Sequence, residues 1–194
     1  MEYWDLYDRD RNLLEGYNLR GTPQPMGTFH LVVHACIFNS AGQMLIQHRQ
    51  PYKQGWSDHW DLGVGGSAVQ GENTRAAMTR EIFEEIGLKA DLTDIAPAVI
   101  LTLDQGGFGG FDDLYVLNMD LDLKELRPQP EEVSELKWVS EDELMQMIDD
   151  DTFIPYQKGL ISYLFFLASH KSTQTRVDTT VAAPLPEGMY TEER

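Results

Sequence analysis

Three glutamates spaced along one predicted helix constrain the fold of this chain more than any other feature of its sequence. Glu81, Glu84 and Glu85 would project from one arc of roughly 100°, since a helix turns by about 100° per residue. Like charges at these spacings destabilise a helix mildly, and a divalent cation would remove that cost. Carboxylate oxygens suit Mg²⁺, or Mn²⁺ in its place. The spacing therefore favours a metal site, with a solvated acidic face as the alternative.

The segments on either side of this helix limit where it can lie. Asn73 or Thr74 can cap its start, and Gly87 stands where a left-handed residue closes a helix. A strand predicted over residues 60–64 ends at the two glycines 65–66, which allow the backbone to approach another group closely. The sequence therefore predicts a tight loop that joins the end of a strand to the acidic helix.

The loop and the helix together carry a longer pattern. From residue 66 it reads Gly, five residues, Glu, seven residues, Arg-Glu-apolar-any-Glu-Glu-any-Gly-apolar. This pattern resembles the Nudix box at every defined position, and so long a match is far more specific than a bare Gly-x-Gly-x-x-Gly. The matching residues are Gly66, Glu72, Arg80, Glu81, Ile82, Glu84, Glu85, Gly87 and Leu88.

The resemblance to the Nudix family implies a fold, a reaction and a set of site residues. The implied fold is α/β, an α/β/α sandwich with a mixed β-sheet. The implied reaction is the attack of water on a diphosphate linked to another moiety, with Mg²⁺ or Mn²⁺ as the cofactor. The implied catalytic residues are Glu72, Arg80, Glu81, Glu84 and Glu85, of which Arg80 and Glu72 fix the loop against the helix. The implied metal ligands are Glu81, Glu84, Glu85 and the carbonyl of Gly65.

The side chains that would bind the substrate lie mostly outside this pattern. Arg49 can pair bidentately with a phosphate, Lys53 can reach one as a mobile charge, and Gly66 leaves room beside the backbone. A general base needs hydrogen-bond reach to the attacking water before its pKa matters. The sequence leaves this base open among Glu81, Asp112 and Asp113.

A wider resemblance, from Trp4 to about Val139, points to the isopentenyl-diphosphate-isomerase-like branch of this superfamily. Isomerases of this type carry a catalytic cysteine near the end of the strand before the loop, followed by a metal-binding histidine. This chain has Val64-Gly65-Gly66-Ser67 there. Of their histidine ligands only His30 has a counterpart, and His30 and His34 are interpreted as structural histidines, with substrate contacts as the alternative. Hydrolysis is therefore favoured, with an isomerase or a non-catalytic ligand-binding module as the alternatives.

The acidic composition limits the partners. Lys and Arg number 15 against 32 Asp and Glu, so the formal net charge is −17. A surface this acidic repels nucleic acid polymers and anionic membranes, so we expect neither as a partner. The partner that the Nudix resemblance implies is a small-molecule diphosphate. We favour a nucleoside diphosphate linked to another moiety, with nucleoside triphosphates and non-nucleotide or prenyl diphosphates as the alternatives. The single cysteine, Cys36, and the lack of a secretory signal at the N-terminus predict a cytoplasmic protein.

One domain is predicted over residues 1–171, with an N-terminal hairpin and linker in 1–27 and an irregular tail in 172–194. A glycine-rich loop is predicted over residues 106–110. Further strands are predicted over residues 3–7, 13–17, 29–38, 44–50, 96–103, 113–121 and 136–139, and a short helix over 141–148.

The last predicted helix runs from Pro155 or Tyr156 to His170 and is apolar on both faces. We expect it to be buried between other elements, because apolar side chains mostly lie in the core. The alternative is a contact between two copies of the chain, which would make the protein a homodimer.

Overall fold

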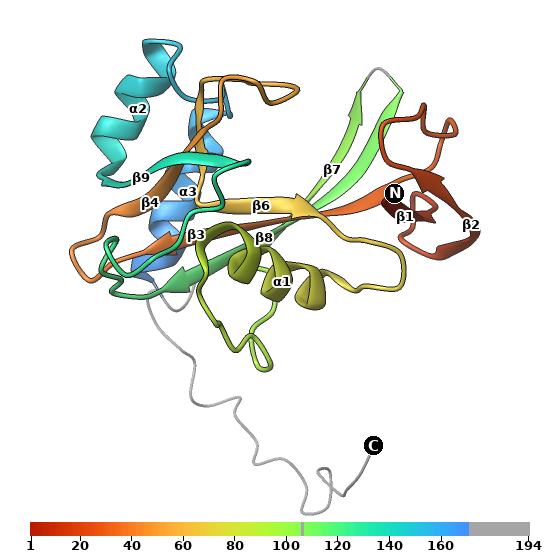
Figure 1. Ribbon diagram of the computed structural model, residues 1–194, viewed down its shortest axis with the longest axis horizontal. Helices are drawn as coiled ribbons and strands as arrows, with labels where there is room; N and C mark the ends of the chain where they lie inside the picture. The colour runs from red at the N-terminus through yellow and green to blue at the C-terminus, as the bar shows by residue number, and fades with distance from the viewer. Residues whose placement is uncertain (106, 171–194) are drawn as a thin grey trace, which may run out of the picture.

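The computed structural model describes residues 1–105 and 107–170, and its strands and helices follow the predicted order (Figure 1). The predicted tail over 172–194 lies outside the described residues. The strands are β1 (Tyr3–Tyr7), β2 (Leu13–Leu19), β3 (His30–Phe38), β4 (Met44–Arg49), β5 (Trp60–Leu62), β6 (Val64–Ser67), β7 (Val99–Gln105), β8 (Phe108–Asn118) and β9 (Val133–Val139). The helices are α1 (Thr74–Ile86), α2 (Glu141–Asp149) and α3 (Lys158–Ser169).

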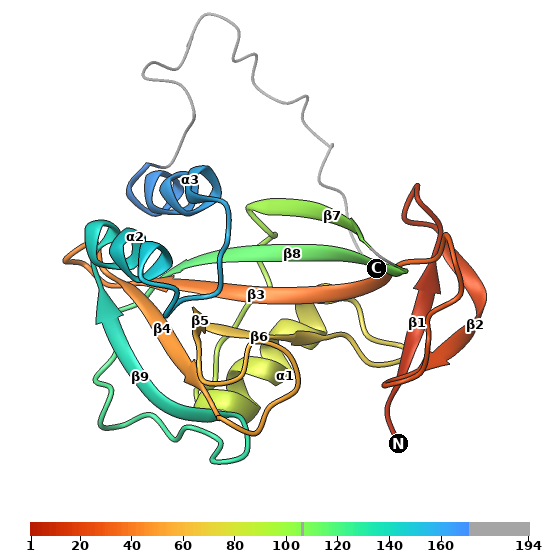
Figure 2. The ribbon, with the colours of Figure 1, turned by 90° about the horizontal axis from the view of Figure 1, so that it is seen from above.

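Seven of the strands form one mixed sheet through the middle of the domain. Its order is β5-β4-β3-β8-β7, with β6 also paired to β3 and β9 to β4. β3 and β8 run parallel, whereas the other pairs of this sheet are antiparallel. Figure 2 shows α1 on one face of the sheet and α3 on the other. The architecture is the predicted α/β/α sandwich with a mixed β-sheet.

The sheet divides the core into two apolar clusters. On one face, Val33 and Ile37 of β3 pack against α1. On the other face, Cys36 and Phe38 of the same strand pack against α2 and α3. All four side chains are buried, so β3 is apolar on both sides, as a central strand with a parallel neighbour requires.

Cys36 is a free cysteine buried in the second of these clusters. No helix within residues 1–105 and 107–170 is long and apolar enough to cross a membrane. The cytoplasmic location stays a prediction from the sequence.

The bounds of several strands differ from their predictions, and two of the differences arise at glycines. The strand predicted over 60–64 is divided into β5 and β6 at Gly63, where a Cβ would lie 2.6 Å from the carbonyl oxygen of Ala35. Residues 108–110, predicted as loop, begin β8, because Gly109 passes directly against the backbone that leads into β3. These approaches join residues far apart in the chain, so the local pattern does not reveal them. β2 ends at Leu19 and β7 runs from Val99 to Gln105, so each ends two residues later than predicted and β7 also begins three residues later. β8 ends at Asn118, short of the predicted residue 121, and β9 begins at Val133, before the predicted residue 136.

The last helix begins later than predicted. α3 starts at Lys158 rather than at Pro155 or Tyr156. The Tyr156 hydroxyl instead donates to Asp61 Oδ1 at 2.9 Å, which ties this segment to β5 before the helix can begin.

The prediction that this helix is buried between elements is wrong for its outer face. Ile161 and Leu164 are buried against the sheet. Tyr163 and Phe166 lie on the other side and are 41% and 38% exposed. One apolar side therefore joins the core, while aromatic side chains remain accessible on the opposite side.

β1 and β2 form a separate two-stranded hairpin beside the loop that leads into α1. The Gln70 amide donates to the Tyr3 carbonyl at 2.8 Å. The Gly71 amide donates to Asp5 Oδ2 at 2.7 Å. Two hydrogen bonds from this loop thus hold the hairpin next to the residues that the sequence assigns to catalysis.

Gly63→Ala should destabilise the protein by about 1–3 kcal/mol, because overpacking against rigid backbone cannot be relieved by a side-chain movement. The added Cβ would meet the carbonyl oxygens of Ala35 at 2.6 Å and Leu45 at 3.2 Å, both inside the sheet. Urea denaturation measures the loss. Gly159→Ala is the control, because open space surrounds that position on α3 and no loss is expected there. Equal midpoints for the two variants would contradict the packing at Gly63.

Candidate active site

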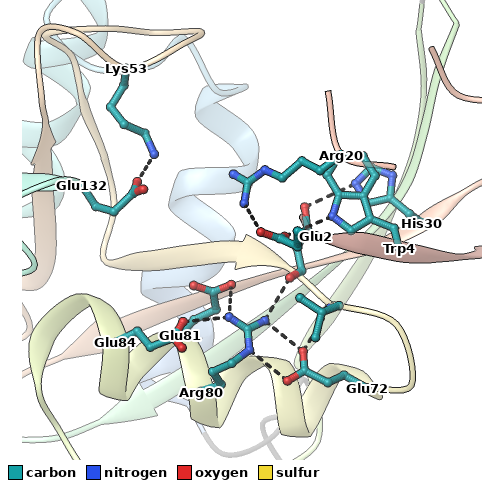
Figure 3. Close-up of polar contacts among 12 residues, drawn as sticks. Glu2, Trp4, Arg20, His30, Lys53, Glu72, Arg80, Glu81, Glu84 and Glu132 are labelled. Carbon is teal, nitrogen blue, oxygen red and sulfur yellow. Dashed lines mark hydrogen bonds and ion pairs between the residues drawn. The ribbon is translucent and has the colours of Figure 1, made fainter. Parts of the chain in front are cut away.

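The Arg80 side chain on α1 joins the loop, the helix and three carboxylates (Figure 3). Its Nε and Nη2 donate to the two carboxylate oxygens of Glu72, each at 2.9 Å. Nη1 donates to Glu81 Oε1 and to Glu84 Oε2, also at 2.9 Å each. Nη2 further donates to the Ser67 carbonyl at 3.1 Å. The predicted pairing of Arg80 with Glu72 is present, and the same guanidinium also binds two of the predicted metal ligands.

The pKa values in this network follow from the pairing. The hydrogen bonds to Glu72 raise the pKa of Arg80 above its ordinary value. Burial by itself would raise the pKa of Glu72, but hydrogen bonds from Arg80 and from the Val69 amide lower it. Both groups therefore keep their charges at neutral pH.

Local sequence chemistry sets the two ends of α1. Asn73 is the N-cap residue, because its side chain accepts from the Ala76 amide at 2.9 Å. Gly87 closes the helix with a left-handed φ of 70°, and its amide donates to the Phe83 carbonyl. These ends match the prediction and fix which turn of the helix carries the glutamates.

Gly66 provides the space in which the Glu81 carboxyl lies. A Cβ at position 66 would overlap that carboxyl group. The Glu81 side chain is 12% exposed. Burial raises its pKa even though Arg80 acts in the opposite direction. The close approach predicted at Gly66 is therefore made by a carboxylate of the site itself.

Glu85 is the most deeply buried carboxylate of the cluster, with 6% of the residue exposed. Its Oε2 accepts from Gln47 Nε2 at 3.3 Å and from the Gly65 amide at 3.2 Å. Burial, followed by repulsion from Glu81, raises the pKa of Glu85 to about 8. Gly65 and Glu85 are both predicted metal ligands, Gly65 through its carbonyl and Glu85 through its carboxylate. The hydrogen bond from the Gly65 amide to Glu85 thus joins these two residues directly.

The carboxylate and carbonyl oxygens of this cluster are of a kind that binds metal ions, but the side chains are not placed around a common point where an ion would lie. Within residues 1–105 and 107–170, no three acidic, imidazole or thiol side chains are placed so that they could hold one. Glu81 and Glu84 are occupied by Arg80, so a cation would have to compete with that guanidinium. The donors are all oxygens, which Mg²⁺ and Mn²⁺ prefer. Burial, and secondarily repulsion between neighbouring carboxylates, raises the pKa values of Glu81 and Glu85, and a bound cation would offset both effects.

Three positive side chains, Lys53, Arg49 and Arg20, interact electrostatically with one another near this carboxylate cluster. Lys53 forms an ion pair with Glu132, and burial together with the charges of Arg49 and Arg20 lowers its pKa. The charges of Glu85 and Glu81 act on Lys53 in the opposite direction. Arg20 thus adds a third positive charge to the two predicted phosphate contacts, Arg49 and Lys53, and it was not predicted from the sequence.

Each of the other two cations also has a carboxylate partner. Arg49 Nη1 lies 3.4 Å from Asp61 Oδ2. Arg20 Nη1 donates to Glu2 Oε2 at 2.8 Å, and both residues come from the hairpin (Figure 3). Only the docking of the hairpin reveals Arg20 as part of the site, because nothing in its local sequence marks it.

The two aspartates predicted as bases have different surroundings. Asp113 Oδ2 accepts from Arg11 Nη2 at 2.7 Å, so this aspartate anchors the turn of the hairpin. Asp112 Oδ1 pairs with His34 Nδ1 at 2.8 Å. Burial alone would lower the pKa of His34, but Asp112, with Asp61 and Glu85 beyond it, raises that pKa to about 9. Through His34, Asp112 belongs to the same charged group as Glu85.

Known proteins share both the sequence and the fold. The NUDIX domain model matches residues 28–173. An uncharacterised Nudix hydrolase of Listeria innocua is 40% identical over 156 residues, which cover 80% of this chain and 90% of that protein. The isopentenyl-diphosphate Delta-isomerase of Streptomyces coelicolor is 34% identical over 131 residues, covering 67% of this chain and 66% of that protein. The crystal structure of DR0079 from Deinococcus radiodurans, 24% identical, covers 84% of this chain and 99% of its own with a TM-score of 0.65.

In the metal-free protein, Glu85→Gln should gain stability relative to the wild type as the pH rises. The folded pKa of about 8 lies above the ordinary 4.5, so the folded protein retains a proton that the unfolded chain loses, and wild-type stability falls between those values. The glutamine keeps an acceptor oxygen for Gln47 and Gly65 but carries no charge. The gain should reach about 1 kcal/mol or more at pH 9 and be smallest at pH 4.

Urea denaturation in the presence of EDTA, repeated at each pH, measures this gain. Glu125→Gln is the control, because Glu125 is exposed and lies outside the site. A gain for Glu85→Gln that stays constant from pH 4 to pH 9 would contradict the raised pKa.

Proposed function

The chain belongs to the Nudix family, and on this basis we propose that it is a Mg²⁺-dependent pyrophosphohydrolase that cleaves the diphosphate linkage of a small molecule. The proposed substrate is a nucleoside diphosphate linked to another moiety. One observation carries the proposal: the carboxylates of Glu81 and Glu85 are both largely buried beside Gly66 and Gly65, and burial raises the pKa of each. Their charges also act on the cation Lys53. A cluster of this kind is suited to binding a divalent cation together with a phosphate.

The proposed ligands of the metal are the side chains of Glu81, Glu84 and Glu85 and the carbonyl of Gly65. A bound Mg²⁺, or Mn²⁺ in its place, polarises phosphate oxygens and lowers the pKa of bound water. Arg80 and Glu72 hold the loop to the helix, so that the ligands from both segments keep their relative positions.

The cations beside the cluster are proposed to bind the two phosphates. Arg49 offers a planar guanidinium that matches a phosphate bidentately, and Lys53 offers a mobile ammonium. Arg20 adds a third positive group from the hairpin. Gly66 is proposed to contribute to this subsite through its backbone, which lies beside the Glu81 carboxyl.

The general base is proposed to be Glu81 or Asp112, with Asp113 as a third candidate. Glu81 and Asp112 are favoured because each belongs to the charged group around Glu85. Asp113 is the weakest candidate, since its ion pair is with Arg11 in the turn of the hairpin and not with a residue of this charged group.

Isomerisation of isopentenyl diphosphate is the second candidate function, because the Streptomyces coelicolor isomerase is 34% identical to this chain. A catalytic thiol is the difficulty for this candidate. Cys36 is fully buried, and burial raises the pKa of its thiol, so it is neither accessible nor ionised. Incubation with isopentenyl diphosphate and Mg²⁺, followed by NMR, would detect the allylic isomer.

A non-catalytic binding module is the third candidate, and turnover of any diphosphate would exclude it.

Addition of Mg²⁺ should raise the melting temperature, because a cation that binds only the folded protein stabilises it by mass action. A panel of linked nucleoside diphosphates, nucleoside triphosphates and prenyl diphosphates, with phosphate release as the signal, should identify the substrate.

Glu84→Gln should lower turnover on that substrate by about 100-fold or more and reduce the effect of Mg²⁺. Its side chain is 50% exposed, so the variant should fold.

The matched control for this prediction is again the exposed Glu125→Gln, which should keep wild-type turnover and the full response to Mg²⁺. Wild-type turnover in Glu84→Gln would exclude Glu84 as a ligand. A melting temperature insensitive to both Mg²⁺ and Mn²⁺, together with an inactive panel, would overturn the proposed hydrolase.

We also propose that the protein forms a homodimer through the outer face of α3. The Tyr163 and Phe166 rings on this face are stacked with centroids 6.2 Å apart, and both are partly exposed. Phe166 also stacks on His170 at 4.3 Å. An aromatic surface of this kind is a common feature of protein interfaces.

Phe166→Glu should leave the fold intact and convert the dimer to a monomer, because an exposed charge is harmless in the monomer but costly in an interface. Light scattering gives the mass, and circular dichroism checks the fold. Leu164→Glu is the comparison, since Leu164 is fully buried and its replacement should unfold the protein. A wild-type mass of 22.1 kDa at micromolar concentration would exclude the dimer.

A further inference from the structure

One face of the hairpin is turned toward the carboxylate cluster. Trp4 lies directly opposite Asn18 in the β1–β2 register, and opposite residues of an antiparallel pair point to the same side. Asn18 is buried, with 6% of its surface exposed, so this side faces the domain. Arg20, just past the end of β2, donates to Glu2, which also accepts from the Trp4 indole. The inward face of the hairpin thus turns Trp4 toward the site, and Glu2 links Trp4 to Arg20.

Trp4 has a rigid support on one of its ring faces. Its indole stacks on the His30 ring with centroids 4.1 Å apart and an angle of 7° between the planes. His30 is buried, and its Nδ1 donates to the Gly109 carbonyl at 3.1 Å and approaches Gln24 Oε1 at 3.2 Å. The Phe108 ring meets His30 edge-on at 5.0 Å. The ring behind Trp4 is therefore held from several directions.

Two series of contacts link the Trp4 indole to the carboxylate cluster, one through Glu2 and one through His30 and Ser67 (Figure 3). Its Nε1 donates to Glu2 Oε1 at 3.4 Å, and the charge of Glu2 is one of those that raise the pKa of Glu81. In the second series, the Ser67 hydroxyl lies 3.5 Å from Nε2 of His30, on which Trp4 stacks, and the Ser67 carbonyl accepts from Arg80. The aromatic pair is thus adjacent to the groups assigned to the diphosphate.

Although Trp4 points inward, it is only half-buried, so part of this residue stays accessible. Aromatic groups gain from parallel, offset contact with such a surface, and an aliphatic group gains less. We propose that Trp4 is a specificity-determining residue that stacks on a planar heteroaromatic ring attached to the diphosphate. The substrate class is then a diphosphate that carries a nucleobase or a similar ring, rather than an alkyl or prenyl diphosphate. This inference rests on the proposed function, because the diphosphate is bound by the cluster described above.

Two non-hydrolysable probes that differ only in the adenosine test this role. α,β-Methylene-ADP carries the ring and methylenediphosphonate does not, and calorimetry in Mg²⁺ gives the affinity of each. The wild type should bind α,β-methylene-ADP more tightly. Trp4→Leu should weaken that binding by about tenfold and leave methylenediphosphonate unchanged, since stacking of a base on an aromatic side chain is worth at least that factor. Tyr17→Leu is the control, because Tyr17 is on the same hairpin but 57% exposed on its outer face.

A second variant covers the case in which Trp4→Leu does not fold. Trp4→Phe keeps an aromatic ring on His30, so it should retain part of the preference for α,β-methylene-ADP. Intrinsic fluorescence should be quenched by α,β-methylene-ADP more strongly in the wild type than in Trp4→Phe, because only the wild type has the indole at this position. Equal quenching in the two proteins would overturn the assignment of Trp4.

The remaining outcomes separate this inference from the function on which it rests. Equal affinity of the wild type for the two probes, or an equal loss for both in Trp4→Leu, would overturn the role of Trp4 and leave the proposed hydrolase standing. Failure of both probes to bind in Mg²⁺ would overturn the proposed hydrolase and the role of Trp4 together.

Discussion

The Arg80 guanidinium is the interaction on which the loop, the helix and the carboxylate cluster all depend. One cation satisfies Glu72 bidentately, contacts Glu81 and Glu84, and binds the Ser67 carbonyl. Hydrogen bonds to charged groups contribute about 1.5–3 kcal/mol each, so this residue is a major source of local stability. The same bonds keep like charges together on one helix, which their mutual repulsion would otherwise oppose.

Local chemistry explains which parts of this site could be predicted from the sequence. The ends of α1 depend on the side chain of Asn73 and the φ of Gly87, which are properties of single residues, and both were predicted. Trp4 and Arg20 of the hairpin were not predicted as part of the site. The hairpin lies beside the site only because it contacts residues far along the chain. The pairing of His34 with Asp112 joins two strands in the same way. Sequence spacing carries information about one helix face, but very little about which loop closes over it.

The cations of the site are already paired in the protein without ligand. Arg20 has Glu2, Arg49 has Asp61, and Lys53 has Glu132. A phosphate that binds here must exchange with these carboxylates, so its net gain is smaller than the number of positive groups suggests. In a protein with a net charge of −17, a metal ion that enters with the substrate removes part of this opposition. The electrostatics of the site therefore favour a diphosphate that arrives as a metal complex over a free anion.

The two glycines in the middle of β6 show why resemblance to an isomerase does not extend to its chemistry. The isomerase pattern has a cysteine near the end of this strand, but a Cβ at Gly65 would lie 2.6 Å from His34 Nε2. His34 cannot easily turn aside, because Asp112 holds its Nδ1. A Cβ at Gly66 would overlap the Glu81 carboxyl, which Arg80 holds in place. The buried histidine and the first glutamate thus occupy the space that a thiol side chain would need, so the framework shared with isomerases is combined here with a site that has room only for glycine.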